Sequence, residues 1–300
     1  MGNVRKVITK SRLVLGTVQL GMGYGVRNTH GAPTKEEAFT ILDAALEVGI
    51  NTFDTATAYG NSEEVLGSWI EAHEQKEAVS IVTKIKGDDA ATIREDIEGS
   101  LSRLQIPKLD GCLLHTPQNM YKADVMNSLK EIKKAGLASN IGVSVYDEGD
   151  ALHALGLDMD YVQVPYNAFN QRLDRMDFFA RAKAKGVTVF ARSPFLQGLL
   201  LMKSEQLPPH LVNARPYLEQ FTEIAKRHDL SQLEAALGFA YLNCRADHIV
   251  FGVDTAVQLK EVTSALERAS AEHASWIDEV VSAFQTMDRA IADPRSWKTV

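Results

Sequence analysis

Eight short apolar runs recur along the chain, and polar, helix-like stretches separate them. The runs are residues 12–17, 50–56, 79–85, 109–116, 140–145, 160–166, 187–193 and 248–253. Each run is rich in Val, Ile and Leu and nearly continuous, whereas a strand with one wet face would alternate apolar and polar positions. The pattern therefore predicts eight strands that are buried on both faces.

The stretches between these runs carry the start and stop signals of helices. In residues 34–49, Thr34 is a candidate N-cap, Glu37 completes a capping box and Gly49 ends the helix. Similar helices are predicted at residues 61–73, 123–136 and 175–186. Residues 194–247 form a longer connection with two further helical segments, which we interpret as an elaborated loop.

The order of these elements predicts the fold. Strands that return about every 20–40 residues, each followed by a helix, are typical of a repeated βα unit. The α/β fold that we expect is a (β/α)₈ TIM barrel over residues 1–300, a single domain with elaborated loops on its C-terminal rim. An open, doubly wound sheet is the alternative. It would need a dinucleotide-binding glycine fingerprint, and GMGYGV fails because Val26 replaces the last glycine, so we interpret that segment as a flexible loop.

Composition excludes several classes of partner. The chain has 300 residues, of which 45% are hydrophobic and 24% charged, as in ordinary globular proteins. Its net charge of −7 argues against nucleic acid and anionic membranes as general partners. Two cysteines without metal-ligand spacing predict neither a disulfide framework nor a metal site. The N-terminus resembles no signal peptide, and no apolar run is long enough to span a membrane, so we expect a cytoplasmic protein.

Reactive side chains stand where consecutive strands end. The second predicted strand ends at Asp54, the third at Lys84 and the fourth at His115, while Tyr59 lies in the loop after Asp54. Taken alone, each has an ordinary explanation: a turn residue, a lysine reaching solvent, a structural histidine or a packed tyrosine. Together they favour a site, because a buried lysine needs a partner and Asp54 is placed to be that partner.

These residue types make chemical sense as a proton donor. A free tyrosine, with a pKa of about 10, is a weak acid at neutral pH. A neighbouring ammonium group favours the phenolate, and a carboxylate would hold that ammonium charged and oriented. An imidazole can hydrogen-bond a substrate oxygen and fix its position. Such a group of side chains suits protonation of an oxygen on which charge develops, as when hydride adds to a carbonyl.

At this point the sequence resembles the aldo-keto reductases nearly end to end. The resemblance rests on LVLGT, GINTFDTATAYGNSEEVLG, VTKI, LDGCLLHTP, IGVSVYD, VQVPYNAFNQR, SPFLQGLL and VFGVDTAVQLKE, which occur in the family's order. It implies a catalytic tetrad of Asp54, Tyr59, Lys84 and His115. It also implies an NADP(H) or NAD(H) cofactor extended across the barrel mouth, a small-molecule carbonyl substrate, and a monomer or small homo-oligomer.

The resemblance also implies cofactor contacts, residue by residue. Ser144 and Gln163 match residues that hold the nicotinamide carboxamide. Ser193, Gly198 and Lys203 match the pyrophosphate loop. The segment that grips the adenosine half is matched by Gly252, Thr255, Gln258 and Glu261, and the remaining implied cofactor contacts are Thr17, Asp54 and Arg192.

Three departures from the family pattern bear on the cofactor. Val145 replaces an Asn beside Ser144, so one carboxamide contact is missing. Arg192 stands where many members have an aromatic residue stacked on the nicotinamide; a guanidinium can stack too, but it adds charge. Val253, Asp254 and Gln258 fall where NADP-preferring members often have Lys, Ser or Arg. We therefore expect weak discrimination between NADPH and NADH.

Two other functions remain open from the sequence: a slow-turnover, cofactor-sensing regulatory subunit on the same fold, and a barrel enzyme that forms a Schiff base on Lys84. The substrate and the direction of the reaction are not encoded in a recognisable motif. The loops 18–33, 117–122 and 194–215 are polar, and they favour a sugar-derived aldehyde or lactol. The candidate contacts for its hydroxyls or for an anionic group are Arg27, His30, Asn119 and Arg192.

Overall fold

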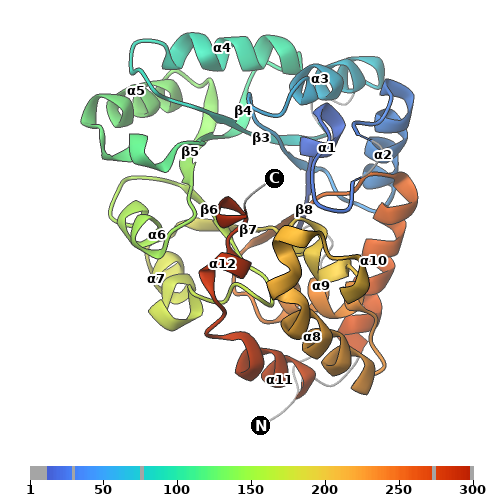
Figure 1. Cartoon of the computed structure of the whole chain (residues 1–300). Coiled ribbons are helices and arrows are strands. Elements are labelled where there is room, and N and C mark those ends of the chain that lie inside the picture. The colour runs from blue at the N-terminus through green and yellow to red at the C-terminus, as the bar shows by residue number, and fades with distance from the viewer. Residues whose placement is uncertain (1–11, 29–30, 75–77, 272–274, 298–300) are drawn as a thin grey trace.

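The computed structural model describes residues 12–28, 31–74, 78–271 and 275–297 (Figure 1). Its eight parallel strands close into a barrel in chain order: β1 (Leu13–Gly16), β2 (Thr52–Asp54), β3 (Ser80–Ile85), β4 (Leu109–Leu114), β5 (Ala138–Ser144), β6 (Tyr161–Pro165), β7 (Thr188–Arg192) and β8 (His248–Phe251). The pairing of Leu15 with Phe251 closes the barrel between β1 and β8. The predicted (β/α)₈ barrel is confirmed.

Helices surround the barrel and cover its outer face. They are α1 (Val18–Gly21), α2 (Lys35–Glu47), α3 (Ser62–Ala72), α4 (Ile93–Leu104), α5 (Ala123–Lys134), α6 (Glu148–Ala154), α7 (Phe178–Ala184), α8 (Arg215–Arg227), α9 (Gln232–Leu242), α10 (Ala256–Ala271), α11 (Ser275–Phe284) and α12 (Arg289–Ala292). Short 3₁₀ segments are η2 (Pro117–Tyr121), η3 (Asp174–Met176), η4 (Leu196–Leu201), η5 (Ser204–Gln206), η6 (Pro209–Ala214) and η7 (Pro294–Ser296). Within the described ranges no helix is long and apolar enough to cross a membrane.

The predicted helix signals are confirmed where the sequence was most explicit. Thr34 and Glu37 form a reciprocal capping box at the start of α2. Gly49, just beyond the end of α2, has φ of +83°, which a side chain would disfavour. The long connection between β7 and β8 contains α8 and α9, the two helical segments expected there. The predicted lack of a signal peptide concerns mainly residues 1–11, which lie outside the described residues.

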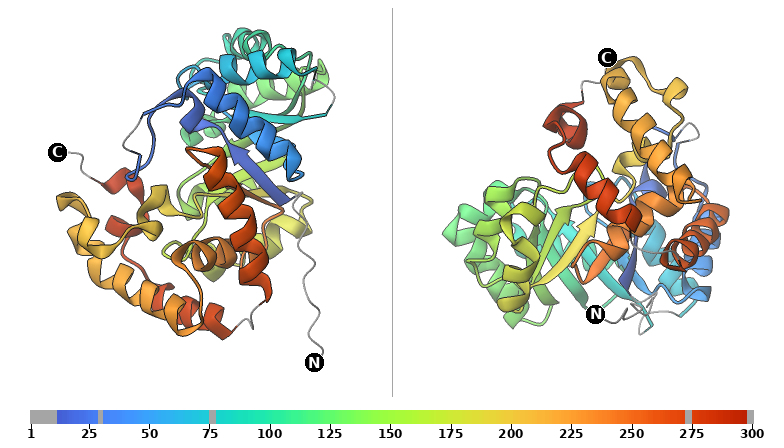
Figure 2. Two further views of the ribbon diagram at one scale, coloured as in Figure 1. Left: turned by 90° about the vertical axis from the view of Figure 1, so that its right-hand side faces the viewer. Right: turned by 90° about the horizontal axis from the view of Figure 1, so that it is seen from below.

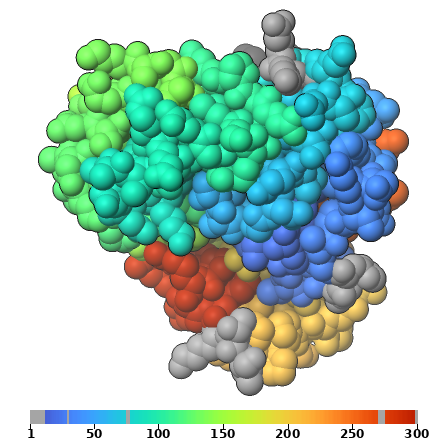
Figure 3. All heavy atoms as spheres, turned by 90° about the horizontal axis from the view of Figure 1, so that it is seen from above, coloured from blue at the N-terminus to red at the C-terminus, as the bar shows by residue number. Residues whose placement is uncertain are grey.

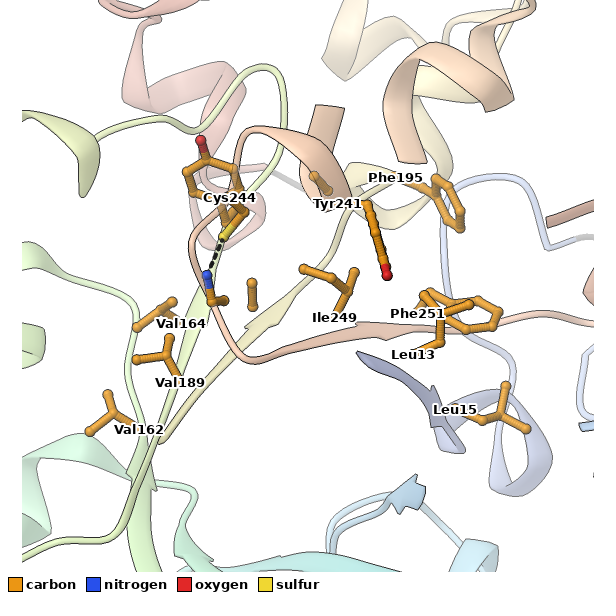
Figure 4. Close-up of a cluster of buried hydrophobic side chains, with 14 of the residues drawn as sticks. Leu13, Leu15, Val162, Val164, Val189, Phe195, Tyr241, Cys244, Ile249 and Phe251 are labelled. Carbon is orange, nitrogen blue, oxygen red and sulfur yellow. Dashed lines mark hydrogen bonds between the residues drawn. The ribbon is translucent and has the colours of Figure 1, made fainter. Parts of the chain in front are cut away.

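Side chains on alternate strand positions build two separate cores. Leu13, Leu15, Ile249 and Phe251 belong to the large outer core between barrel and helices (Figure 4). A small inner core fills the barrel with Val14, Val82, Leu113, Phe190 and Val250, against which Tyr161 packs. This two-residue period, read along each strand, decides which side chains face the barrel interior.

The loops at one end of the barrel gather the distant parts of the chain. In the left view, α12 lies beside the segment that leads into α8, at that end of the barrel (Figure 2). The space-filling view shows the C-terminal segment and the residues after β7 beside those that follow β1 (Figure 3). This is the C-terminal rim, where barrel enzymes carry their sites.

Two glycines fix the turn that carries Tyr59. A Cβ on Gly21 would lie 1.9 Å from the Tyr59 carbonyl oxygen, and one on Gly60 would lie 2.2 Å from that of Gly21. Gly60 also has φ of +57°. The glycine-rich segment after β1, which the sequence suggested to be a flexible loop, therefore packs backbone to backbone against this turn.

Candidate active site

Strand alternation directs the predicted catalytic side chains into the barrel mouth. Lys84 lies two residues beyond Val82, and His115 two beyond Leu113, so both follow residues of the inner core. Arg192 stands in the same relation to Phe190. Asp54 lies one position beyond Phe53, which belongs to the outer core, and it therefore faces inward too.

Lys84 and Asp54 form a buried ion pair at the floor of this mouth. Lys84 is fully buried and Asp54 is 3% exposed. The Lys84 Nζ lies 2.5 Å from Asp54 Oδ1 and donates to the Thr55 carbonyl oxygen at 3.0 Å. Burial alone would lower the pKa of Lys84, but the charge of Asp54 and the Tyr59 oxygen offset this and hold it above its usual value. The lysine is therefore kept as a cation.

Tyr59 stands above this pair with His115 beside it. The Lys84 Nζ lies 3.5 Å from the Tyr59 hydroxyl, and 5.0 Å from the centre of its ring. The Tyr59 and His115 rings meet edge to face, with their centres 5.7 Å apart. The structure thus brings the four predicted catalytic residues together.

His115 is held in its neutral form. Burial, and then the positive charges of Lys84 and Arg192, lower its pKa from 6.5 to about 4. At neutral pH its imidazole can donate one hydrogen bond and accept another, without carrying a charge of its own.

Gln163 connects the ion pair with Ser144. Its Nε2 donates to Asp54 Oδ2 at 2.7 Å, and its Oε1 accepts from the Ser144 hydroxyl at 3.3 Å. Both oxygens of Asp54 are therefore occupied, one by Lys84 and one by Gln163. Thr17 is also fully buried below the mouth, where its side chain donates to the Asp54 carbonyl oxygen at 3.2 Å.

A cavity of about 470 Å³ opens above these residues. Gly16 and Gly252 line it on the β1 and β8 side. Of the predicted site residues, Asp54, Tyr59, His115, Ser144, Arg192, Ser193, Gly198, Gly252, Gln258 and Glu261 line the cavity. Those that do not are Thr17, Lys84, Gln163, Lys203 and Thr255.

The loop after β7 bends in a way that suits an anion. Ser193, Leu196 and Gln197 have φ of 64°, 48° and 54°, and Gly198 follows with φ of 95°. Left-handed residues are costly outside glycine, so such a run is typical of functional loops, and it can turn backbone N–H groups toward one point. Arg27 from the β1 loop packs over Gly198, 3.2 Å from the position of a Cβ there.

The first turn of α10 closes the opposite end of the cavity. Thr255 accepts a hydrogen bond from the Gln258 backbone N–H at 3.1 Å, and Gln258 Oε1 accepts from that of Asp254 at 2.7 Å. Asp254 also accepts from Asn28 Nδ2 at 3.0 Å, so the β1 loop is tied to the start of α10. A helix N-terminus favours negative charge, although Asp254 opposes it here.

Arg192 is held in a stack in which its guanidinium and that of Arg295 both pack on the Tyr146 ring. Its Cζ lies 4.2 Å from the centre of the Tyr146 ring, and its Nη2 donates to the Val145 carbonyl oxygen at 3.2 Å. Arg295, from η7, covers Tyr146 at 4.3 Å. Arg295 is anchored in turn by Asp147 and Asp293.

Several cavity residues escaped the sequence analysis. Gln19, Tyr24 and Tyr146 all line the cavity. Gln19 is notable because its Oε1 is buried without a hydrogen-bond partner among the described residues. No motif in the sequence identifies these residues, because their place in the cavity wall depends on how the loops fold back over the barrel.

Of the four residues suggested as substrate contacts, only two line the cavity in the described part of the chain. Arg27 and Arg192 line the cavity, but Asn119 is committed elsewhere, donating to Lys86 and Asp88. His30 lies outside the described residues. Lys203 is exposed and away from the cavity, so its assignment to the pyrophosphate stays a prediction.

Curated proteins of known name are similar to this chain in sequence. Aldo-keto reductase YhdN of Bacillus subtilis is 29% identical over 211 residues, which cover 65% of this chain and 62% of that protein. L-galactose dehydrogenase of Arabidopsis thaliana is 26% identical over 271 residues, covering 82% of this chain and 83% of that protein. The match to YhdN thus spans less than two thirds of that relative's length.

Solved structures share the fold. The aldo-keto reductase AKR11C1 of Bacillus halodurans superposes with a TM-score of 0.72 at 20% identity, covering 94% of this chain and 95% of that one. The family model described as Aldo/keto reductase family matches residues 12–282. The chain therefore belongs to the aldo/keto reductase family.

Proposed function

We propose that this protein is an NAD(P)H-dependent oxidoreductase that reduces an aldehyde or ketone to an alcohol, or catalyses the reverse reaction. One observation carries the proposal: a fully buried Lys84–Asp54 pair lies directly beneath the Tyr59 hydroxyl at the floor of the cavity. Burying two charges is costly, and a lysine cation held under a phenol serves proton transfer better than it serves stability.

The residues around the cavity fit a nicotinamide dinucleotide. The left-handed loop from Ser193 to Gly198 and the cation of Arg27 suit a pyrophosphate. Gln258 and Glu261, on the first turns of α10, suit the adenosine half. Ser144 offers a hydroxyl toward the nicotinamide end, and the unpaired Oε1 of Gln19 lies against Gly252 on the β8 side. When bound, the reduced cofactor supplies a hydride.

In this account Tyr59 delivers the proton. Its hydroxyl proton passes to the carbonyl oxygen of the substrate as that oxygen gains negative charge. Lys84 stabilises the phenolate left behind, and Asp54 keeps the lysine in place with help from Gln163. The neutral His115 donates a hydrogen bond to the same substrate oxygen and orients it.

The substrate that we propose is a small polar carbonyl compound, with a sugar-derived aldehyde or lactol preferred. Polar groups of Tyr24, Asn28 and Tyr146 line the cavity, which suits hydroxyl groups. One relative in the same family is named for L-galactose, which supports a sugar for this chain. We also propose residence in the cytoplasm, where the buried thiols of Cys112 and Cys244 would stay reduced.

Fluorescence titration with NADH and NADPH, followed by a panel of carbonyl substrates, tests the proposal. We expect both nucleotides to bind, with dissociation constants within about twentyfold of each other, because the Asp254 carboxylate repels a 2′-phosphate while the N-terminus of α10 favours it. Single-turnover oxidation of the bound cofactor then separates an enzyme from a slow cofactor sensor. If neither nucleotide binds, the proposed function is wrong.

A further inference from the structure

Arg192 lines the cavity, and the proposed mechanism does not use its charge. Within the described part of the chain it forms no ion pair with a carboxylate, and its side chain donates to the Val145 carbonyl oxygen. The negative charge of Asp54 is already balanced by the Lys84 cation, which lies 2.5 Å from Asp54 Oδ1. The positive charge of Arg192 is therefore uncompensated inside the mouth.

The location of Arg192 is set by contacts on the β5 side of the cavity. It binds the carbonyl of Val145 and stacks on Tyr146, the two residues that follow Ser144. Its charge also acts on His115 and on Tyr24. A nicotinamide ring with its carboxamide at Ser144 and its reacting edge toward Tyr59 and His115 would lie beside the Arg192 guanidinium.

Arg192 has little freedom to move away. Tyr146 has Arg192 on its ring at 4.2 Å and Arg295 at 4.3 Å. Arg295 is tied to Asp147 at 3.1 Å and to Asp293 at 2.5 Å. The C-terminal segment thus holds the tyrosine in place, and the tyrosine holds Arg192 against the cavity.

We infer that Arg192 makes the pocket bind the reduced cofactor more tightly than the oxidised one. Reduced nicotinamide is neutral, whereas the oxidised ring carries one positive charge, because hydride leaves with both bonding electrons. A fixed cation beside the ring repels only the oxidised form. This inference rests on the proposed function, and it adds a direction: the site retains the reduced cofactor and releases the oxidised cofactor that carbonyl reduction produces.

The expected size follows from electrostatics. Like charges in contact at a partly buried site repel enough to change a binding constant by at least about tenfold, which corresponds to about 1.4 kcal/mol. We therefore expect the dissociation constant of the oxidised form to exceed that of the reduced form by about tenfold or more.

Binding measurements test this without relying on turnover. Dissociation constants are measured for the oxidised and reduced forms of each nucleotide, and for ADP-ribose, in wild type, Arg192→Gln and Arg192→Lys. Removing the charge should lower the oxidised-to-reduced ratio by about tenfold, chiefly through tighter binding of the oxidised form. Arg192→Lys should keep most of the ratio, and ADP-ribose, which lacks the ring, should bind all three proteins alike.

A second variant tests the support for Arg192 without touching the cavity charge itself. Arg295→Gln should lower the same ratio by a smaller factor, because Tyr146 and Arg192 gain freedom. An unchanged ratio in Arg192→Gln, or an equal weakening of both forms, would overturn the inference while leaving the proposed function intact. Failure of every nucleotide to bind wild type would overturn both.

Discussion

At the scale of single residues, Asp54 and Lys84 depend on each other. Each is buried, and each would be an isolated charge without its partner. Their types and their places at strand ends were predictable from the sequence, because a buried lysine demands a nearby acid. The hydrogen bond from Gln163 to Asp54 was not predictable, since it joins side chains 109 positions apart.

The first prediction concerns this pair. Lys84→Met leaves Asp54 buried with only Gln163 to bind it, and should lower the free energy of unfolding by about 3–5 kcal/mol. Asp54→Asn should also destabilise the protein, but the double variant should lose clearly less than the sum of the two single losses. Urea unfolding of all four proteins measures the coupling. Additive losses would mean that the pair does not exist.

The second prediction concerns His115, whose folded pKa is about 4. Between this value and the unfolded value of 6.5, the unfolded chain binds a proton that the folded protein does not. Stability should therefore fall as the pH drops from about 6.5 to about 4, by at most about 3 kcal/mol from this group. NMR of the imidazole, assigned with His115→Gln, should show it neutral at pH 5.5. Titration near pH 6.5 would contradict the account.

At the scale of elements, the strands and helices form the barrel, and contacts between its loops position the residues around the cavity. The strands and helices were predictable because periodicity and caps are local properties of the sequence. The contacts between loops were not predictable. The packing of Gly21 against the Tyr59 carbonyl and the hydrogen bond from Asn28 to Asp254 join segments that no local sequence pattern links. The β1 loop thus supports Tyr59 at one end and reaches α10 at the other.

The third prediction tests the support of Tyr59. In Gly21→Ala the new methyl group would meet the Tyr59 carbonyl oxygen, so the turn must shift. We expect kcat to fall by about tenfold or more, because small displacements of a catalytic group are costly, while NADPH binding changes little. Gly23→Ala is the matched control, since a Cβ there meets only Gly31 at 3.3 Å. Equal activity of the two variants would show that Gly21 is not needed.

The fourth prediction concerns the nucleotide preference at the start of α10. Asp254→Arg should shift preference toward NADPH by about tenfold or more, the effect of one new ion contact with a 2′-phosphate. Asp254→Asn is the control, because it removes the charge without adding a cation. Dissociation constants for NADH and NADPH measure the shift. A wild-type preference for NADPH beyond about a hundredfold would place the phosphate elsewhere.

At the scale of the whole molecule, the barrel brings strand ends together and the C-terminal segment completes the mouth. Asp54, Lys84 and His115 were predictable as neighbours because consecutive parallel strands end on one rim. The role of Arg295 was not, because only the folded chain brings η7 across the rim to Tyr146. The same long-range closure explains why Gln19, Tyr24 and Tyr146 were missed as cavity residues.

The central claim is that Tyr59 is the general acid above the Lys84–Asp54 pair. Tyr59→Phe removes one oxygen and should leave the fold and NADPH binding nearly unchanged. General acid catalysis typically contributes about 10²–10⁴-fold, so kcat for reduction of a carbonyl substrate should fall by at least about a hundredfold. The decisive measurement is single-turnover oxidation of bound NADPH in wild type and Tyr59→Phe. Such a loss with intact cofactor binding is the predicted result, and retention of more than about a tenth of the wild-type rate would contradict the account.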